Sequence, residues 1–374
     1  MKRLILKPGE EKRLLRGHLW AYRNEFESMA DLQDGELVDV FAEKGRFVGR
    51  GFFQQEGGIA VRLLSRHQED IAAAFFSRRV RDALAFRNRL YPGDSVYRWV
   101  FGESDGLPGF VADRFGHIVS AKSPCTFYET HIEQLAGTFL ACEDVEGVRI
   151  DVRGAVHRIG RVPATVEIGL HGLKITVDLE SGQKTGMFLD QRENCLAAAR
   201  YSAGLRVLDG HCFIGLWSCL AARAGASHVL AVDSSSQAIE LAQRNAAANG
   251  LADRCEFQCT DVSEALAQRG PFDIVFLDPP AFAKTPSHRD KALGLYQALN
   301  RTAMRALTPG GYLITSNCSH YVSRADFLEV LKRAARGTQR EARLIELRGA
   351  APDHPVLLSM PETEYLTCAV LRIM

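Results

Sequence analysis

Several features that define other classes of protein are missing from this sequence of 374 residues. Its nine cysteines form no C-x-x-C pair, which argues against a zinc knuckle, and their odd number argues against a disulfide framework. No segment approaches the run of about 20 apolar residues that a membrane span needs. No G-x-G-x-x-G motif occurs, which counts against an ordinary dinucleotide dehydrogenase. We therefore expect a cytoplasmic protein with reduced, mostly buried thiols and neither a metal nor a membrane partner.

No charge of one sign dominates the chain. It carries 46 Lys and Arg against 45 Asp and Glu, a formal net charge of +1. It therefore has no global positive field of the kind that drives non-specific nucleic-acid binding, and any contact with RNA must be local. The composition, with 46% hydrophobic and 24% charged residues, is that of a folded protein, and the length supports two or three domains.

The hydrophobic pattern divides the chain into three segments. Residues 1–70 alternate short β-like runs with turns, which indicates a small β-rich module, and residues 71–185 indicate a second, α+β domain. From residue 186 to 374 strands and helices alternate, which predicts an α/β fold built on a mostly parallel, doubly wound sheet. The strands expected in that sheet are 205–209, 228–233, 255–260, 272–278, 311–316, 344–347 and 365–373.

Three successive strands of this sheet end at an acid, and ligands bind such sheets beyond the carboxyl ends of the strands. Asp209 ends the first strand and is followed by a glycine-containing turn. Asp233 ends the second, where a carboxylate can accept both ribose hydroxyls of an adenosyl cofactor. Asp261 follows the third, where it can accept from an adenine amino group. A single acid also fits a role at a helix terminus, but three together predict a cofactor site that disfavours phosphate and suits a cation.

The fourth strand ends in a group suited to a nucleobase. Asp278 is followed by Pro279 and Pro280, which remove two backbone donors and stiffen the loop. A flat ring can stack on Phe282 while the acid and the loop carbonyls contact its edge. A rigid loop at a strand end can also be purely structural.

Two cysteines compete as a nucleophile at this edge of the sheet. Most thiols in the chain are expected to be inert, because free cysteine is commonly buried and behaves as a small hydrophobe. Cys318 follows the fifth strand, next to the strand of Asp278, where a polar turn can expose its thiol. Cys212 falls in the first-strand loop that we assign to the cofactor, so we favour Cys318.

An amphipathic helix over residues 71–90 carries five arginines against one acid, Asp82. Its arginines can form a solvated face whose aliphatic stems pack on the protein. Alternatively, Arg78, Arg79 and Arg81 contact phosphates, and these three are our candidates for RNA binding outside the base pocket.

At these motifs the chain resembles the class I S-adenosylmethionine-dependent RNA methyltransferases of the RlmI type, which form 5-methylcytosine in bacterial large-subunit rRNA. The resemblance covers essentially the whole chain, and its most specific string is Gly182-Gln-Lys-Thr-Gly-Met-Phe-Leu-Asp-Gln-Arg192. The other motifs lie at residues 17–20, 103–109, 113–116, 278–282, 317–319 and 353–355. The resemblance implies a PUA-type RNA-binding module in residues 1–70, a small central domain in 71–185, and a Rossmann-like methyltransferase domain with a seven-stranded sheet in 186–374.

The resemblance also implies S-adenosylmethionine as the cofactor and residues that hold it. The signature string supplies Lys184, Phe188, Asp190 and Arg192, and the strand ends supply Asp209, Phe213, Gly215, Asp233, Ser234, Asp261, Val262 and Asp278. The chain departs from the family in the first-strand loop, with His211, Ile214 and Leu216-Trp217 in place of an aromatic residue, a threonine and small residues. Met187 also stands where the family commonly has an aromatic residue.

The activity that the resemblance implies is methylation of C5 of a cytosine in large-subunit rRNA. Cys318 is then the nucleophile, Asp278 contacts the N3 edge of the base, and Pro279 and Phe282 line the base pocket. Three alternatives stay open: methylation of a guanine nitrogen, methylation of uracil C5, and a non-catalytic role as an RNA-binding assembly factor. Attack by a ring nitrogen needs no thiol, so Cys318 argues against the first. A homodimer, the target nucleotide and the base that removes the C5 proton also stay open.

Overall fold

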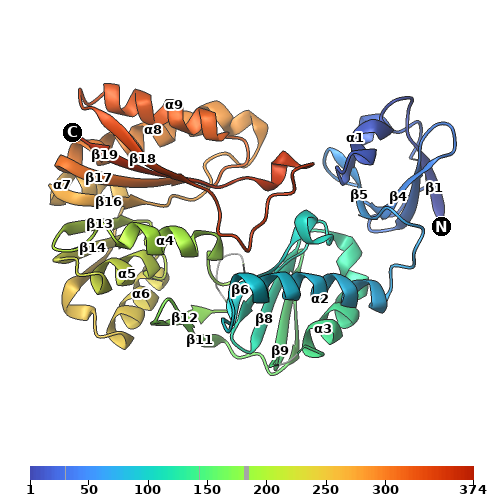
Figure 1. The fold of residues 1–374 in the computed structure, drawn as a ribbon, viewed down its shortest axis with the longest axis horizontal. Coiled ribbons are helices and arrows are strands. Elements are labelled where there is room, and N and C mark those ends of the chain that lie inside the picture. The colour runs from blue at the N-terminus through green and yellow to red at the C-terminus, as the bar shows by residue number, and fades with distance from the viewer. Residues whose placement is uncertain (30, 143, 181–184) are drawn as a thin grey trace. The chain divides into compact units, whose positions relative to one another are not determined.

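The computed structural model describes residues 1–29, 31–142, 144–180 and 185–374 (Figure 1). By its internal contacts the chain forms two compact units. The first holds Met1–Val166, Asp178–Gly186 and Pro352–Thr363, and the second holds Glu167–Val177, Met187–Ala351 and Glu364–Met374. The three-domain division at residues 70 and 185 stays a prediction.

The first unit begins with a five-stranded sheet of order β1-β3-β4-β5-β2. Side chains at alternate positions, such as Val38 and Val40, pack with Val61 in a hydrophobic core. A Cβ at Gly51 would lie 2.1 Å from the carbonyl oxygen of Arg62, so only glycine allows the close approach of β4 and β5. The elements are Lys2–Ile5 (β1), Glu11–Leu15 (α1), Trp20–Tyr22 (β2), Leu37–Phe41 (β3), Phe47–Phe53 (β4) and Ile59–Ser65 (β5). The β-rich start of the chain is confirmed.

A second five-stranded sheet, of order β10-β9-β8-β7-β6, follows in the same unit. Trp99, Phe110 and Phe139 fill its core, where the rings of Trp99 and Phe139 meet edge to face at 5.1 Å. The strands are Val96–Phe101 (β6), Val111–Phe115 (β7), Ile118–Ser123 (β8), Gly147–Val152 (β9) and Ala155–Gly160 (β10), and the helices are Ala73–Leu90 (α2) and Ile132–Leu140 (α3).

Helix α2 does not present all five arginines to solvent. Arg87 is 0% exposed, whereas Phe86 beside it is 37% exposed. The guanidinium of Arg87 is buried because it forms two hydrogen bonds with Asp105, at 2.6 and 2.7 Å. The expectation that the five arginines of this helix form a solvated face was wrong for Arg87, because its ion pair with Asp105 stabilises the guanidinium in the interior.

The second unit is built on a mostly parallel sheet of order β15-β14-β13-β16-β17-β19-β18 (Figure 1). Its strands are Arg206–Gly210 (β13), His228–Asp233 (β14), Cys255–Cys259 (β15), Phe272–Leu277 (β16), Leu307–Asn317 (β17), Ala342–Arg348 (β18) and Thr367–Ile373 (β19). The helices are Arg192–Ala199 (α4), Leu216–Arg223 (α5), Ser236–Ala248 (α6), Val262–Arg269 (α7), Arg289–Ala306 (α8) and Arg324–Arg336 (α9). The hairpin of Thr165–Leu170 (β11) and Leu173–Asp178 (β12) precedes them. This sheet confirms the predicted seven-stranded, mostly parallel, Rossmann-like fold.

The strand register places the predicted site residues along one edge of this sheet. Gly210 of β13 pairs with Val232 of β14 and with Leu277 of β16. Leu277 in turn pairs with Thr315 of β17. The residues that follow these strands, including Asp278 and Cys318, therefore lie at the same edge, as the doubly wound topology requires.

Candidate active site

The loop after β13 folds in a conformation that few residues adopt. His211 and Phe213 have φ values of 64° and 48°, and Gly215, which precedes α5, has φ 80°. A Cβ at Gly215 would also lie 3.0 Å from the Cβ of Ala242, so glycine is required there on two counts. Such strain in non-glycine residues is typical of ligand-binding loops. Burial lowers the pKa of His211, so its imidazole is neutral near pH 7.

Asp233, at the end of β14, holds this loop against the sheet. Its Oδ2 accepts a hydrogen bond from the backbone N–H of Phe213 at 3.0 Å, and its Oδ1 accepts from Ser235 at 2.9 Å. The carboxylate is half-buried, and each oxygen has a second lone pair for a ligand. Ser234 is exposed beside it, while Ser235 caps α6.

Asp261 serves as the N-cap of helix α7. Its carboxylate accepts hydrogen bonds from the backbone N–H groups of Ser263 and Glu264, at 2.8 and 3.3 Å. The side chain is exposed, whereas Val262 next to it is buried in the core of the unit. The structure thus gives Asp261 a capping role, and its contact with an adenine stays a prediction.

Asp209 lies deeper than the other two acids. It is 1% exposed, and its Oδ2 accepts a hydrogen bond from the hydroxyl of Ser218 on α5 at 2.5 Å. Burial raises the pKa of this carboxyl group to about 7, partly opposed by the Ser218 hydroxyl and reinforced by the nearby Asp278. Asp209 therefore ties β13 to the first turn of α5.

The signature string contributes an aromatic side chain to the first-strand loop. The ring of Phe188 meets that of Phe213 edge to face at 5.1 Å, and both are half-buried. Asp190 and Arg192 are buried: the hydroxyl of Tyr365 donates to Asp190, and Arg192 pairs with Glu193 at 3.3 Å. Lys184 lies outside the described residues.

Cys318 and Pro279 meet where β16 and β17 end. The thiol of Cys318 donates to the carbonyl oxygen of Pro279, with 3.7 Å between sulfur and oxygen, and the cysteine is half-buried. The ring of Phe282 packs against Tyr296 at 4.6 Å and is also half-buried. The structure therefore brings Asp278, Pro279 and Cys318 together. The ring of Phe282 is partly covered by Tyr296.

The loop that carries Cys318 is held by buried hydrogen bonds on both sides. The Ser319 hydroxyl accepts from the backbone N–H of Ala283 at 3.2 Å and lies 3.0 Å from the hydroxyl of Tyr296. Asn317 accepts from the backbone N–H of Ser319 at 2.9 Å and donates to the carbonyl of Val322. These contacts tie the loop after β17 to the loop after β16, so the backbone on both sides of Cys318 is held in place.

Cys212 is buried, and burial raises the pKa of its thiol well above the ordinary range. A thiol in that environment is neither ionised nor accessible at neutral pH. All nine cysteines lie in the described part of the chain as thiols, and six of them are buried, as expected from the sequence.

Gln191 is a residue of the site that sequence reasoning missed. It is 2% exposed, and its Nε2 donates to Oδ1 of Asp278 at 2.7 Å and to the Ser316 hydroxyl at 2.9 Å. Its position between Asp190 and Arg192 in the signature string is the one signal that could have found it.

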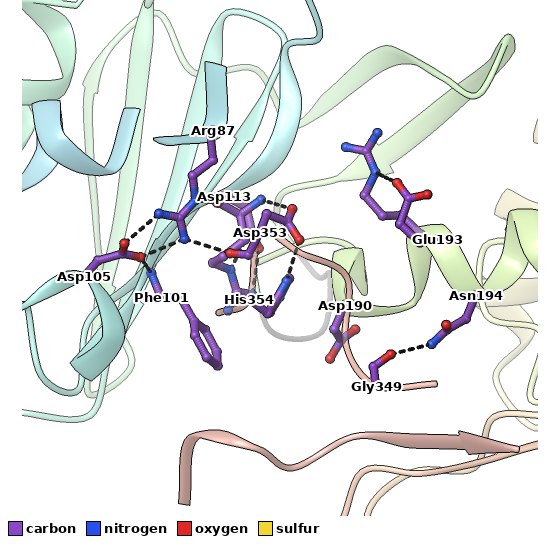
Figure 2. Close-up of polar contacts among 12 residues, drawn as sticks. Arg87, Phe101, Asp105, Asp113, Asp190, Glu193, Asn194, Gly349, Asp353 and His354 are labelled. Atoms are coloured by element: carbon purple, nitrogen blue, oxygen red, sulfur yellow. Dashed lines mark hydrogen bonds and ion pairs between the residues drawn. The ribbon is translucent and has the colours of Figure 1, made fainter. Parts of the chain in front are cut away.

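The first unit contains its own buried polar network, which joins two of the motifs that carry the resemblance (Figure 2). Arg87 donates to Asp105 and to the carbonyl of Asp353 at 2.7 Å. Asp353 accepts from the backbone N–H of Arg98 at 2.9 Å, and its Oδ1 lies 2.8 Å from Nδ1 of His354. These contacts explain the motifs at residues 103–109 and 353–355 as structural anchors.

The three arginines predicted to bind RNA differ in exposure. Arg78 and Arg81 are exposed, and Arg78 pairs with Glu69. Arg79 is half-buried over the ring of Phe75 and donates to the carbonyl of Leu64 at 3.3 Å, and burial lowers the pKa of its guanidinium. The first two are therefore better placed than Arg79 for a phosphate.

Among the described residues, no cluster of three or more His, Cys, Asp or Glu side chains could hold a metal ion. Of the helices in the described part of the chain, none combines the length and apolar character of a membrane span.

The edge of the sheet in the second unit fits S-adenosylmethionine. Gly215 has a left-handed backbone conformation, and a Cβ at Gly210 would lie 2.7 Å from Cγ1 of Val262. Because neither glycine carries a side chain, the backbone of this turn can lie close to a ligand. The half-buried carboxylate of Asp233 suits the ribose hydroxyls, and the acidic surroundings suit a sulfonium cation. Phe188 and Phe213 would supply an apolar wall.

Comparison with known proteins agrees with S-adenosylmethionine as the cofactor. A model of the PUA-like domain matches residues 4–66, and a model of the S-adenosylmethionine-dependent methyltransferases matches residues 153–357. Fold and site thus define a methyltransferase that uses S-adenosylmethionine. Ribosomal RNA large subunit methyltransferase I from Shewanella denitrificans is 37% identical over 395 aligned residues, which cover 99% of each chain. The chain belongs to the family of this enzyme.

Solved structures show the same fold over the whole length. A methyltransferase from Streptococcus mutans, described as dependent on S-adenosylmethionine, has a TM-score of 0.88 at 20% identity and full coverage of both chains. A methyltransferase structure complexed with S-adenosylhomocysteine has a TM-score of 0.89, also at 20% identity and full coverage.

Proposed function

We propose that the protein methylates C5 of a cytosine in large-subunit rRNA. The name of its Shewanella relative and the PUA-like domain support an rRNA substrate, which would place the protein in the cytoplasm. One observation carries the choice of chemistry: the half-buried thiol of Cys318 lies at the same sheet edge as Asp278, 3.7 Å from the Pro279 carbonyl. A nucleophilic thiol is needed for methylation of a pyrimidine carbon and not for methylation of a ring nitrogen.

The proposed reaction begins with the thiolate of Cys318, because C5 of cytosine is too weak a nucleophile on its own. The thiolate adds to C6, the C5–C6 double bond opens, and the electron pair is delocalised towards N3. C5 of the resulting enamine then bonds to the methyl carbon. When bound, S-adenosylmethionine supplies that methyl group from its sulfonium. A base removes the C5 proton, the C5–C6 double bond forms again, and the bond between C6 and sulfur breaks to return the thiolate.

Asp278 would stabilise the ring while the cysteine is attached. Negative charge develops at N3 as the thiolate adds, and a carboxyl group that carries or shares a proton can donate a hydrogen bond there. The rigid Pro279-Pro280 turn after β16 keeps Asp278 at the edge of the sheet. Asp278 thus contributes mainly to the transition state.

The test of the reaction is transfer of labelled methyl groups from S-adenosylmethionine to total rRNA, followed by nucleoside analysis. The expected product is labelled 5-methylcytosine. Labelled 5-methyluracil or a methylguanine would overturn the choice of base. Absence of saturable cofactor binding would favour the non-catalytic assembly factor instead.

The test of the nucleophile is a covalent trap. RNA that contains 5-fluorocytosine should form a denaturant-resistant adduct with the wild-type protein, because fluorine at C5 cannot leave as a proton. Cys318→Ala should form no adduct and lose turnover while it still binds cofactor and RNA. Cys212→Ala should still form the adduct. An adduct that persists in Cys318→Ala and disappears in Cys212→Ala would show that the nucleophile is Cys212, in the first-strand loop.

A further inference from the structure

We propose that Gln191 is a positioning residue for Asp278, and that Asn194 and Arg348 fix the orientation of its side-chain amide. The proposal rests on the proposed function in that it assigns Asp278 to the reacting base. It concerns residues of the second unit alone, and all of its contacts are hydrogen bonds between side chains or with nearby backbone.

The polarity of this hydrogen-bond chain is set at Arg348. A guanidinium only donates, so the atom of Asn194 that faces Nε of Arg348, at 2.9 Å, must be the oxygen Oδ1. The Nδ2 of Asn194 is then left to donate to the carbonyl of Gly349 at 3.0 Å, a contact drawn in Figure 2. The same Nδ2 donates to Oε1 of Gln191 at 2.7 Å.

Gln191 passes this polarity on to Asp278. Because its oxygen is taken by Asn194, its Nε2 must face the other way, where it donates to Oδ1 of Asp278 at 2.7 Å and to the Ser316 hydroxyl at 2.9 Å. Both hydrogens of the amide are used. A turn of the amide by 180° would place its oxygen against the carboxyl oxygen of Asp278 and its NH2 against that of Asn194, so the observed orientation is strongly preferred.

The local structure explains how these groups meet. Gln191 ends the short 3-10 helix Leu189–Gln191, and Asn194 lies one turn later in α4, so the two side chains share a helix face. Arg348 is the last residue of β18 and is itself held by Glu346, with 3.1 Å between Nη1 and Oε2. The chain from Glu346 to Asp278 thus links the edge strand of the sheet to the proposed base pocket.

The consequence for Asp278 is that its two oxygens are not equivalent. Oδ1 accepts from Gln191, and the carbonyl oxygen of a protonated carboxyl group accepts better than its hydroxyl oxygen. When the group carries a proton, the contact therefore favours Oδ2 as its place. A carboxyl group fixed in this way keeps one orientation, without a search over rotamers at the moment of reaction.

The test is a double-mutant cycle on the rate of methyl transfer, measured as total label in RNA irrespective of the base. Gln191→Met keeps the length of the side chain and removes both hydrogen bonds, and it should lower kcat at least tenfold while the Kd for S-adenosylmethionine stays within twofold. Asn194→Asp keeps its shape and takes away the donor to Gln191, so the amide should turn its oxygen to Asp278 and kcat should again fall at least tenfold. In the Gln191→Met background, Asn194→Asp should cost no further activity.

Asn249→Asp is the matched control. The side-chain amide of this asparagine also forms hydrogen bonds with backbone groups of the same unit, namely the N–H and the carbonyl of Lys174. It should leave kcat within twofold of wild type. Losses that multiply in the Gln191→Met, Asn194→Asp double variant would overturn the positioning role, as would unchanged kcat in folded single variants. A wild-type enzyme that methylates another base would overturn the proposed function and still allow the coupling between Gln191 and Asn194 to be measured.

Discussion

The hydroxyl of Ser218 donates a hydrogen bond of 2.5 Å to Oδ2 of Asp209, which ties β13 to the first turn of α5. Asp209 is among the most buried carboxyl groups of the second unit, and burial raises its pKa to about 7. The protonated acid is therefore the stable form in the folded protein below neutral pH. This has a consequence for stability, because an unfolded chain ionises the same group near pH 4.

We expect the free energy of unfolding to decrease as the pH rises from about 4 to 7 through the contribution of Asp209. Within this window the folded carboxyl group keeps its proton and the unfolded one has lost it, so raising the pH favours the unfolded state. Above pH 7 both are ionised and the contribution is constant. Three pKa units correspond to roughly 4 kcal/mol. Urea unfolding of wild type and Asp209→Asn at pH 5 and pH 8 covers two of these three pH units, or roughly 3 kcal/mol.

Asparagine cannot ionise and can still accept the hydrogen bond from Ser218. The wild type should therefore lose unfolding free energy between pH 5 and pH 8 through Asp209. Asp209→Asn should lack this loss, so its stability relative to wild type should be higher at pH 8 than at pH 5. An equal pH dependence in the two proteins would show that Asp209 is ionised in the folded state throughout.

Much of the second unit could be predicted because its signals are local. A run of apolar residues predicts a buried strand, and an acid at its end marks where the strand stops. The strand predicted at 228–233 therefore has the same bounds as β14. The strand expected at 311–316 begins four residues earlier, at Leu307. Pro309 and Gly310 read as a turn, but the irregular pairing between β16 and β17 accommodates them.

The residues that sequence reasoning missed are those whose role depends on distant partners. Gln191 looks like any polar residue at the start of a helix, and only the ends of β16 and β17 give it its distant partners, Asp278 and Ser316. Arg87 looks like an exposed helix arginine, and it is buried because Asp105, 18 residues further along the chain, neutralises it. Such pairings have no periodicity, so a pattern in the sequence does not reveal them.

Arg87→Met should destabilise the first unit strongly. Arg87 is fully buried and donates to Asp105, to the carbonyl of Arg98 and to the carbonyl of Asp353. Removal of one partner of a buried ion pair leaves an uncompensated charge and costs about 3–5 kcal/mol. Chemical unfolding gives the change, and Arg89→Met, at an exposed arginine of the same helix, serves as the control. A loss below about 1 kcal/mol would show that Asp105 is solvated in the folded protein.

Asp233→Ala should weaken S-adenosylmethionine binding. Two ribose hydroxyls would lose a charged acceptor, at a cost of roughly 1.5–3 kcal/mol, and the backbone N–H of Phe213 would lose its partner as well. Isothermal titration of the folded variant gives the change in Kd, and the affinity for RNA should barely change. Unaltered cofactor affinity would show that Asp233 does not contact S-adenosylmethionine.

Loss of Arg78 and Arg81 should weaken RNA binding and make it less sensitive to salt. Both are exposed on α2, and each phosphate contact contributes about 0.7–0.9 to the slope of log K against log salt. Arg78→Gln with Arg81→Gln should therefore flatten the slope by up to roughly twice that amount. The half-buried Arg79 should contribute to folding rather than to the slope, since it donates to the Leu64 carbonyl and covers Phe75.

The control for this pair is Lys332→Gln with Arg333→Gln, which removes the same charge from an exposed face of α9. Filter binding to rRNA between 50 and 200 mM salt distinguishes a local contact from a change in net charge. If the contact is local, only the α2 variant changes the slope, because the released counterions are those of the phosphates that it touches. An equal change in both variants, or no change in either, would leave the α2 arginines as a solvated face.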